Sequence, residues 1–360
     1  MPIPPFRIVR LLREAVSESC LNRVFEDING VNESLHTGCT VGRTMLRNIL
    51  THPDSVGFTP RHIAAFHYYF KVRKDISFQH VPVLEIRNIC EALGEKQRVV
   101  FMYGAKPRPE EQRTDNSRWD TRSNGELIRQ FTLAGGQHQI EYMDVLWTNP
   151  VDPVALLNEE WYRVINDDRA SIVSIGSPLA ALSSELMMAR MFDVPPFMPP
   201  KVTTRKPVPF FFVWLHKIAS NFHSAFGLSA EDLQTDYPEL AERVRKNQST
   251  AVIMDKEVRE SPIRASEWTM YGIIAAQRRS AGNVWLVVAG LHGPATYGAA
   301  KVVQDICEEL PWPSHGKSPV LWVPVKVLVG AGTAKATDGD VRIVKKAELD
   351  GSPRFWVPGA

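Results

Sequence analysis

The chain has 360 residues, of which 42 are Lys or Arg and 40 are Asp or Glu, so its formal net charge is only +2. Its 44 % apolar and 23 % charged residues exclude a chain disordered throughout, and its apolar runs are far shorter than the ~20 residues that cross a bilayer. The four cysteines form no C-x-x-C pair, which argues against a zinc ribbon or a disulfide framework, and without a signal-peptide pattern we expect a cytoplasmic protein.

The period of the apolar pattern changes near residue 95. Before that point apolar residues recur at helical spacing, and after it short β-branched runs end at glycine-containing turns. We therefore predict an all-helical domain over residues 1–95 and an α/β domain over residues 96–360. The fold class is α/β, with a mixed, mainly parallel central sheet and flanking helices.

In the first domain the apolar stripes predict one long helix or two short ones, ended by Asn29-Gly30. Thr40 is the expected N-cap of a short helix that runs to about Leu50. A further helix is expected to begin at Thr59-Pro60, because proline at the first helical position loses no hydrogen bond.

Positive charge is concentrated in this domain. Six basic residues lie between Thr40 and Lys74, against the single acid Asp54. Clusters of this kind bind phosphate backbones, because each neutralised phosphate releases a counterion. The same arginines would also suit a structural role, in which a helical domain docks onto the α/β domain and its charges are merely solvated.

The short helix TVGRTMLRNIL, the turn THPDSVG and the segment FTPRHIAAFHYYFKV together resemble the helix-turn-helix domain of Cro/C1-type (XRE-like) regulators. The resemblance implies binding of double-stranded DNA by a homodimer, with the recognition helix in the major groove and further cations near phosphates. The residues that it implies for DNA binding are Thr40, Arg43, Thr44, Arg47, Arg61, Lys71 and Lys74.

The second domain shows three β-branched runs that each end at a glycine, as parallel strands with crossover helices do. These predicted strands are Arg98–Tyr103, Ser171–Ile175 and Trp285–Ala289, with a further one at Gln139–Leu146. Between them, the polar segment Lys106–Gly125 is expected to form a long surface loop.

In the C-terminal third the extended runs predict adjacent strands of a mixed sheet. The runs are Ala251–Val258, Tyr271–Arg278, Asn283–Ala289, Val320–Val329 and Val341–Lys346. Pro324 lies inside one of them, which favours an edge strand or a bulge at that point.

Two strand–helix turns carry the predicted ligand site. Ser177 and Gly293 are each followed by a proline, so we expect each to cap a helix whose first N–H groups point past the carboxyl edge of the sheet. Such an edge holds ligands in open α/β sheets, and we predict a small anionic or nucleotide-like ligand there. The candidate ligand-binding residues are Gly104, Arg108, Gly176, Ser177, Gly290, His292, Gly293 and Thr296.

No motif fixes a reaction. The chain lacks a P-loop, a G-x-G-x-x-G turn, a G-x-S-x-G elbow and an H-E-x-x-H helix, so we assign no cofactor, catalytic residue or metal ligand. The preferred hypothesis is a DNA-binding regulator whose α/β domain senses a ligand. One alternative is an enzyme that acts on nucleotides or nucleosides, in which Ser177, His292 and Asp255 are brought together and the helical domain serves docking or oligomerisation. The other alternative is an interaction scaffold that binds no ligand.

Overall fold

The computed structural model describes most of the chain in thirteen stretches. They are residues 5–34, 40–51, 60–74, 89–94, 98–108, 113–134, 139–146, 159–195, 208–214, 226–262, 267–313, 318–330 and 340–357. The chain divides into two compact units, the first consisting of Met1–Glu91 with two short later segments and the second of the remaining residues. None of the helices in the described part is long and apolar enough to cross a membrane.

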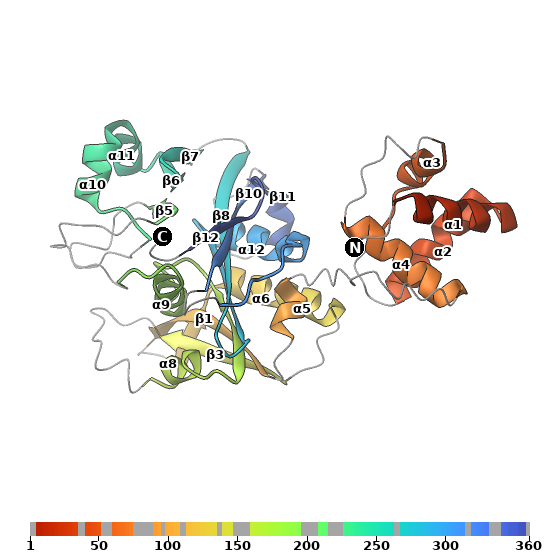
Figure 1. Cartoon of the computed structure of the whole chain (residues 1–360). Helices are drawn as coiled ribbons and strands as arrows, with labels where there is room; N and C mark the ends of the chain where they lie inside the picture. The colour runs from red at the N-terminus through yellow and green to blue at the C-terminus, as the bar shows by residue number, and fades with distance from the viewer. Residues whose placement is uncertain are drawn as a thin grey trace. The chain divides into compact units, whose positions relative to one another are not determined.

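The described residues of the helical unit form helices α1 to α4, drawn in Figure 1, and their buried apolar side chains make one cluster. Leu12, Ile28, Leu46 and Phe66 are fully buried in that core, one from each helix. The helices are α1 (Pro5–Glu18), α2 (Leu21–Ser34), α3 (Arg43–Thr51) and α4 (Pro60–Lys74). The start of α4 at Pro60 agrees with the sequence prediction, and Thr59 lies outside the described residues.

Two predicted helix boundaries in this unit are wrong. Asn29-Gly30 does not end α2, which continues to Ser34. The Asn29 side chain bonds the backbone of Val41 from within the helix, donating to its carbonyl (3.2 Å) and accepting from its N–H (3.0 Å). Thr40 does not cap α3, because Gly42 supplies the carbonyl that accepts the first helical bond, from Leu46 N.

The described part of the α/β unit forms a nine-stranded sheet in the order β11-β10-β8-β9-β4-β1-β2, with β12 beside β10 and β3 beside β1. Three of its pairings are parallel (β3-β1, β1-β4 and β4-β9) and five are antiparallel, so the sheet is mixed but not mainly parallel. The strands are β1 (Arg98–Arg108), β2 (Arg113–Asn116), β3 (Gln139–Leu146), β4 (Ala170–Ile175), β8 (Trp268–Arg278), β9 (Val284–Gly290), β10 (Val320–Val329), β11 (Val344–Leu349) and β12 (Arg354–Trp356).

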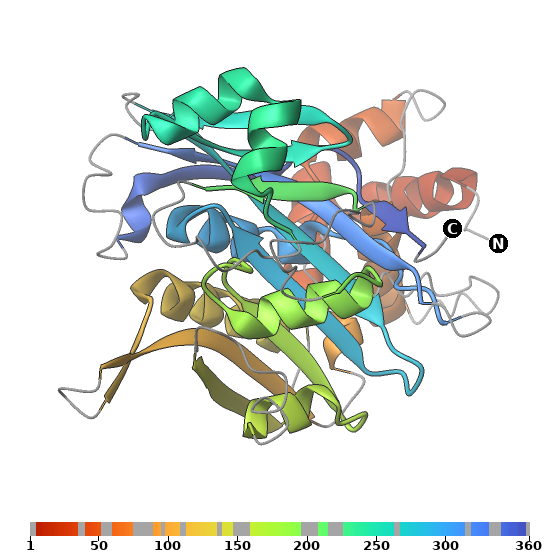
Figure 2. The ribbon, with the colours of Figure 1, turned by 90° about the vertical axis from the view of Figure 1, so that its left-hand side faces the viewer.

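Helices cover both faces of this sheet. On one face α9 packs into the same apolar cluster as Val100, Ile172 and Trp322. On the other face Gly298 of α12 lies against Val327 of β10. Val327 is five residues after Trp322, and side chains an odd number of residues apart on a strand point to opposite faces of the sheet. Figure 2 shows α9 in front of the strands. The helical segments of this unit are α5 (Ile89–Leu93), which spans the boundary between the units, α6 (Arg118–Leu133), α8 (Glu160–Ile165), α9 (Leu182–Met191), α12 (Gly293–Lys301), and the 3-10 turns η3 (Val303–Asp305) and η5 (Val341–Ile343).

A second, three-stranded sheet lies between α9 and β8 in the chain. It has the order β5-β6-β7, and Figure 2 shows α10 and α11 beside it. Its segments are β5 (Phe210–Val213), α10 (Ala230–Asp236), α11 (Pro238–Arg245), β6 (Ser249–Met254) and β7 (Glu257–Pro262). The predicted strand 251–258 is therefore two strands of this separate sheet, because Asp255 and Lys256 have positive φ (49° and 70°) and form a two-residue hairpin turn.

Two further expectations are corrected by the strand and helix bounds. The segment 106–125 is not a loop, since it holds the end of β1, all of β2 and the first half of α6. Pro324 is not on an edge strand, because β10 has β8 on one side and β12 and β11 on the other. β12 pairs with residues 320–322 of β10 and β11 pairs with residues 325–329, so Pro324 lies between these two pairings. Its carbonyl accepts a hydrogen bond from Asp350 N on that side, and the N–H that proline lacks would face the same gap.

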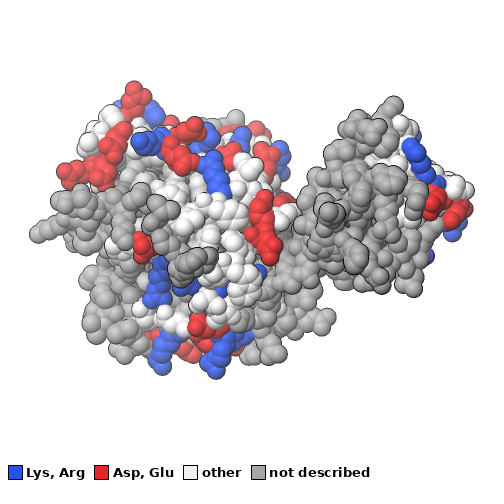
Figure 3. All heavy atoms as spheres, viewed as in Figure 1, with Lys and Arg blue, Asp and Glu red and all other residues white. Residues whose placement is uncertain are grey.

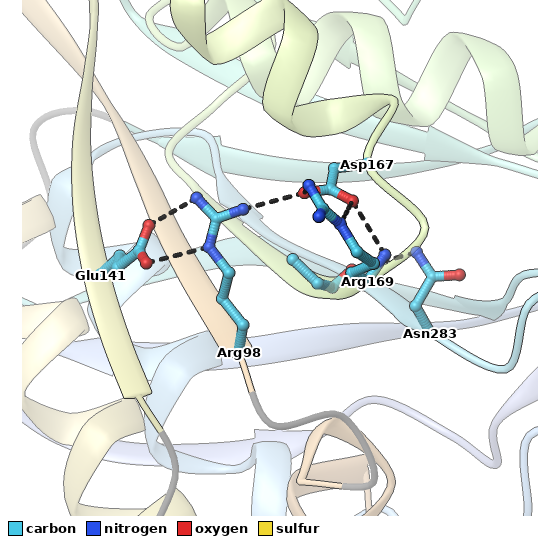
Figure 4. Close-up of polar contacts among 6 residues, drawn as sticks. Arg98, Glu141, Asp167, Arg169 and Asn283 are labelled. Carbon is cyan, nitrogen blue, oxygen red and sulfur yellow. Dashed lines mark hydrogen bonds and ion pairs between the residues drawn. The ribbon is translucent and has the colours of Figure 1, made fainter.

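Arg98 holds together the amino ends of the parallel strands. Its guanidinium forms a bidentate pair with Glu141 of β3 (2.9 and 2.6 Å) and a third bond to Asp167, which precedes β4 (2.9 Å; Figure 4). Hydrogen bonds from Arg98 are the main reason why the pKa of Glu141 is lowered. The pKa of Asp167 is lowered as well, mainly by the hydrogen bond from the Arg169 side chain. This network lies at the end of the strands opposite the predicted ligand site.

We expect the Arg98→Met variant to lose about 2 kcal/mol of unfolding free energy at neutral pH, because two carboxylates lose a charged hydrogen-bond donor. Carboxyl groups with a lowered pKa stabilise the folded state above their unfolded pKa, and this stabilisation disappears as pH falls through the folded pKa. The deficit of the variant should therefore shrink in acid, measured by denaturant unfolding. Arg169→Met is the matched control: its side chain is 88 % exposed, so solvent screens its pair with Asp167 and its effect should be clearly smaller than that of Arg98→Met.

Candidate ligand site at the carboxyl edge of the sheet

The carboxyl ends of β1, β4 and β9 lie side by side. Tyr103 pairs with Ile175, and Ile175 pairs with Val288 of the next parallel strand. The turns after these strands therefore meet at one edge, and Gly176 donates its N–H to the carbonyl of Val288 (3.0 Å). The structure thus brings Gly104, Gly176 and Gly290 together at this edge, as the sequence pattern predicts. Gly104 itself lies inside β1, however, so the predicted end of that strand at Gly104 is wrong.

Glycine is required at this edge because backbone approaches backbone there. A Cβ on Gly104 would lie 2.1 Å from the carbonyl oxygen of Ala180, and one on Gly290 would lie 2.3 Å from the amide nitrogen of Thr296. Gly176 has φ of +115°, a conformation that side-chain-bearing residues rarely adopt. These three residues shape the edge, and β1 continues past Gly104 to Arg108, whose side chain lies outside the described part.

Neither predicted helix cap is correct. Ser177 starts a separate turn, in which its carbonyl accepts from Ala180 N (2.9 Å) and Ala181 N (2.8 Å), and α9 begins only at Leu182. In the second turn the N-cap is His292, one residue before Gly293. Its carbonyl accepts from the N–H groups of the third and fourth helical residues, so those N–H groups already have partners.

His292 lies beside the small sheet. Its Nε2 is 3.3 Å from Oγ1 of Thr250 on β6. The residue is exposed, and desolvation lowers the pKa of the imidazole below its usual value. Thr296, by contrast, is 2 % exposed and its hydroxyl approaches the carbonyl of His292 (3.5 Å), so it faces its own helix.

The first turn of α6 supplies a buried carboxyl group that the sequence analysis missed. Asp120 is 6 % exposed, and a Cβ on Gly176 would lie 3.6 Å from its Oδ2. Burial alone raises the pKa of Asp120 to about 7. Among the described residues its carboxyl group has no hydrogen-bond or ion-pair partner. A carboxyl group placed in this way is a common mark of a functional site.

Asn124 lies one helical turn after Asp120. It is 8 % exposed, and its Oδ1 has no hydrogen-bond partner in the described structure. The preceding Trp119 anchors the helix, because its ring carbon Cδ1 would be 2.3 Å from a Cβ on Gly293. The Ser117-x-x-Asp120 spacing is a helix-start signal that could have placed α6, but it would not have shown that the carboxyl group faces Gly176.

The triad of Ser177, His292 and Asp255 does not form. Asp255 makes an ion pair with Arg354 at the β6–β7 turn, and the imidazole of His292 contacts Thr250 instead. Among the described residues no group of three or more His, Cys, Asp or Glu side chains is placed to hold a metal ion.

The predicted DNA-binding residues of the helical unit are placed in part. Thr40, Arg43, Thr44 and Arg47 are exposed, whereas the side chains of Arg61, Lys71 and Lys74 lie outside the described part. Within this set the guanidinium of Arg43 stacks on the Phe25 ring of α2, 5.1 Å from its centroid. In the view of Figure 3 basic and acidic side chains lie close together on the described surface of this unit, where Arg73 also pairs with Asp27.

The connection between α2 and α3 spans residues 35–42, which is longer than the three or four residues of an ordinary helix-turn-helix turn. The position of α3 against α2 rests instead on the bonds from Asn29 to Val41 and on the Arg43–Phe25 contact. A tight turn is therefore not what fixes these two helices.

Fold and site together define a protein of two compact units, one helical and one mixed α/β, in which Gly176 at the end of β4 lies against the buried carboxyl group of Asp120. The chain matches no family model, no curated protein and no solved structure.

Proposed function

We propose that this protein is a cytoplasmic DNA-binding regulator, in which α3 contacts double-stranded DNA and the α/β unit binds a small nucleotide-like ligand at the carboxyl edge of β1, β4 and β9. A homodimer on two half-sites is part of the proposal. The observation that carries it is the division of α3 into two sides: Leu46 and Ile49 are buried, while Arg43, Thr44 and Arg47 are exposed.

The exposed side of α3 has the chemistry that DNA binding needs. Two arginines one turn apart supply cations for phosphates or guanine edges, and the hydroxyl of Thr44 lies between them along the helix. A ligand regulates such a protein only when it binds one arrangement of the units better than another. The proposal therefore requires that ligand binding changes the affinity for DNA.

The cleanest test is the Arg47→Ala variant. Unlike Arg43, whose stacking on Phe25 adds about 0.5–1 kcal/mol to stability, Arg47 has no described ring contact, so its removal should leave folding unchanged. Binding to a labelled random-sequence duplex, followed by anisotropy over a salt series, should weaken steeply with salt in the wild type. The slope of log K against log salt should fall by about 0.9 in the variant, since one phosphate contact is lost.

Arg23→Ala is the matched control, because Arg23 is an exposed arginine on α2 of the same unit. Its slope should equal that of the wild type. Binding that is insensitive to salt, or equal slopes for the two variants, would remove the regulator proposal.

An enzyme that acts on nucleotides or nucleosides is the second candidate, and one observation favours it. Asp120 on α6 lies near Gly176, and His292 lies in the turn after β9 at the same sheet edge. The pKa of Asp120 is raised to about 7, and that of His292 is lowered below its usual value. Groups poised in this way can act as acid and base. Turnover of nucleotides that is lost in both Asp120→Asn and His292→Gln would favour this enzyme over the regulator.

A further inference from the structure

We propose that the side of α6 that carries Asp120 and Asn124 binds the vicinal diol of a ribose-type sugar. This inference names the ligand class for the α/β site and rests on the ligand-binding half of the proposed function, but not on the DNA-binding half.

The first argument is the geometry of the two side chains. Asp120 and Asn124 are four residues apart, so they project from the same side of α6, and both are more than nine-tenths buried. Buried polar atoms in folded proteins nearly always have partners, yet Oδ1 of Asn124 has none in the described structure. Burial is the one cause of the raised pKa of Asp120, with no hydrogen bond or neighbouring charge contributing among the described residues. An occupant that supplies hydrogen bonds to both would complete this site.

The second argument is the kind of group that faces them. Oδ1 of Asn124 can only accept a hydrogen bond, whereas Asp120, with its pKa raised to about 7, can accept or donate near neutral pH. A hydroxyl group both donates and accepts, so it suits both side chains. A carboxylate or phosphate cannot donate to Oδ1 of Asn124, and it would be repelled by Asp120 whenever that group is ionised. The anionic group expected from the sequence, where the ligand has one, must therefore lie away from α6.

The third argument separates hydroxyl donors from cationic ones. The surroundings of Asp120 disfavour charge, as its raised pKa shows, so an ammonium or guanidinium group would also lose hydration on entering. The exposed Arg118 and Arg122 on the same helix repel a cation as well. Two hydroxyls on neighbouring carbon atoms provide a pair of donors at much lower desolvation cost. The diol could belong to a nucleotide or to a free sugar phosphate.

The test uses the full chain and calorimetric binding of four probes: AMP, 2′-deoxy-AMP, ribose 5-phosphate and agmatine. The wild type should bind AMP at least about tenfold more tightly than 2′-deoxy-AMP, because one hydrogen bond to a buried acceptor is lost. Asp120→Asn should abolish that preference, whereas Asp236→Asn, an exposed acid on α10, should keep it. Equal binding of AMP and ribose 5-phosphate assigns the diol to a sugar phosphate, and binding of AMP alone assigns it to a nucleotide.

Three results would overturn the inference: equal affinity for AMP and 2′-deoxy-AMP, binding of agmatine that Asp120→Asn abolishes, or saturable binding of neither AMP nor ribose 5-phosphate. These results are distinct from failure of the regulator proposal. If the protein discriminates the two nucleotides but shows no salt-dependent binding of duplex DNA, the sugar site stands and the regulator proposal fails. If it binds duplex DNA in a salt-dependent way but does not discriminate the two nucleotides, the regulator proposal stands and the sugar site fails.

Discussion

The Asp120→Asn variant is expected to be more stable than the wild type at alkaline pH, with a gap in unfolding free energy that grows by about 4 kcal/mol between about pH 4 and pH 8. The reason is the pKa of Asp120, which rises from 3.8 to about 7 on folding because the group is buried without a partner. The unfolded chain then releases this proton at a lower pH than the folded chain. Wild-type stability therefore falls as pH rises through that interval, and asparagine has no proton to release.

Denaturant unfolding of both proteins over this pH range measures the effect. Subtracting the two curves removes the contributions of the other carboxyl groups, such as Glu141, whose pKa is lowered and whose pH dependence has the opposite sign. A difference curve that is flat with pH would mean that Asp120 has a partner in solution, and the sugar site would lose its main support. A gain in stability together with a loss of ligand binding is the pattern expected of a functional residue.

The Gly290→Ala variant should lose about 3 kcal/mol of unfolding free energy, close to the upper end for overpacking of a buried site. Its Cβ would lie 2.3 Å from the amide nitrogen of Thr296 and 2.6 Å from the carbonyl carbon of Ala295. Both atoms belong to the backbone of α12, so the helix itself has to shift rather than a flexible side chain. The midpoint of denaturant unfolding measures the loss.

Gly125→Ala is the matched control for this experiment. Gly125 lies inside α6 with no atom within 4 Å of the added Cβ, so alanine should stabilise the unit by about 0.5–1 kcal/mol through its better helix propensity. The same chemical change thus has opposite signs at the two positions. Equal effects at Gly125 and Gly290 would contradict the close approach of α12 to the end of β9.

The strands that the sequence predicted well are those whose signal is local. The run 139–146 matches β3 and the run 320–329 matches β10. In the first, polar and apolar residues alternate, and the second is almost wholly apolar, and both are local patterns typical of strands. The pairing of these strands is not local. The direction of β8 and β10 relative to β9 depends on connections that composition does not encode, and this is why the sheet was predicted to be mainly parallel.

The candidate site was predictable only at the level of its turns. Glycines after two strands located the edge, but Asp120 and Asn124 lie on a helix inside a stretch whose charge and proline content are typical of a loop. Their importance depends on burial and on the absence of a hydrogen-bond partner for Oδ1 of Asn124 among the described residues, and the order of the residues in the sequence indicates neither. The exposed side of α3, in contrast, followed directly from helical periodicity.

The small sheet has a mechanical consequence for this edge. Trp214, just after β5, donates from Nε1 to the carbonyl of Leu291 (3.2 Å), and Thr250 of β6 contacts the neighbouring His292. The inserted sheet therefore contacts two consecutive residues of the β9–α12 connection, one through Thr250 on β6 and the other through Trp214 just after β5. A displacement of the small sheet away from this connection would therefore break both contacts at once and free two adjacent residues at the edge of the candidate site.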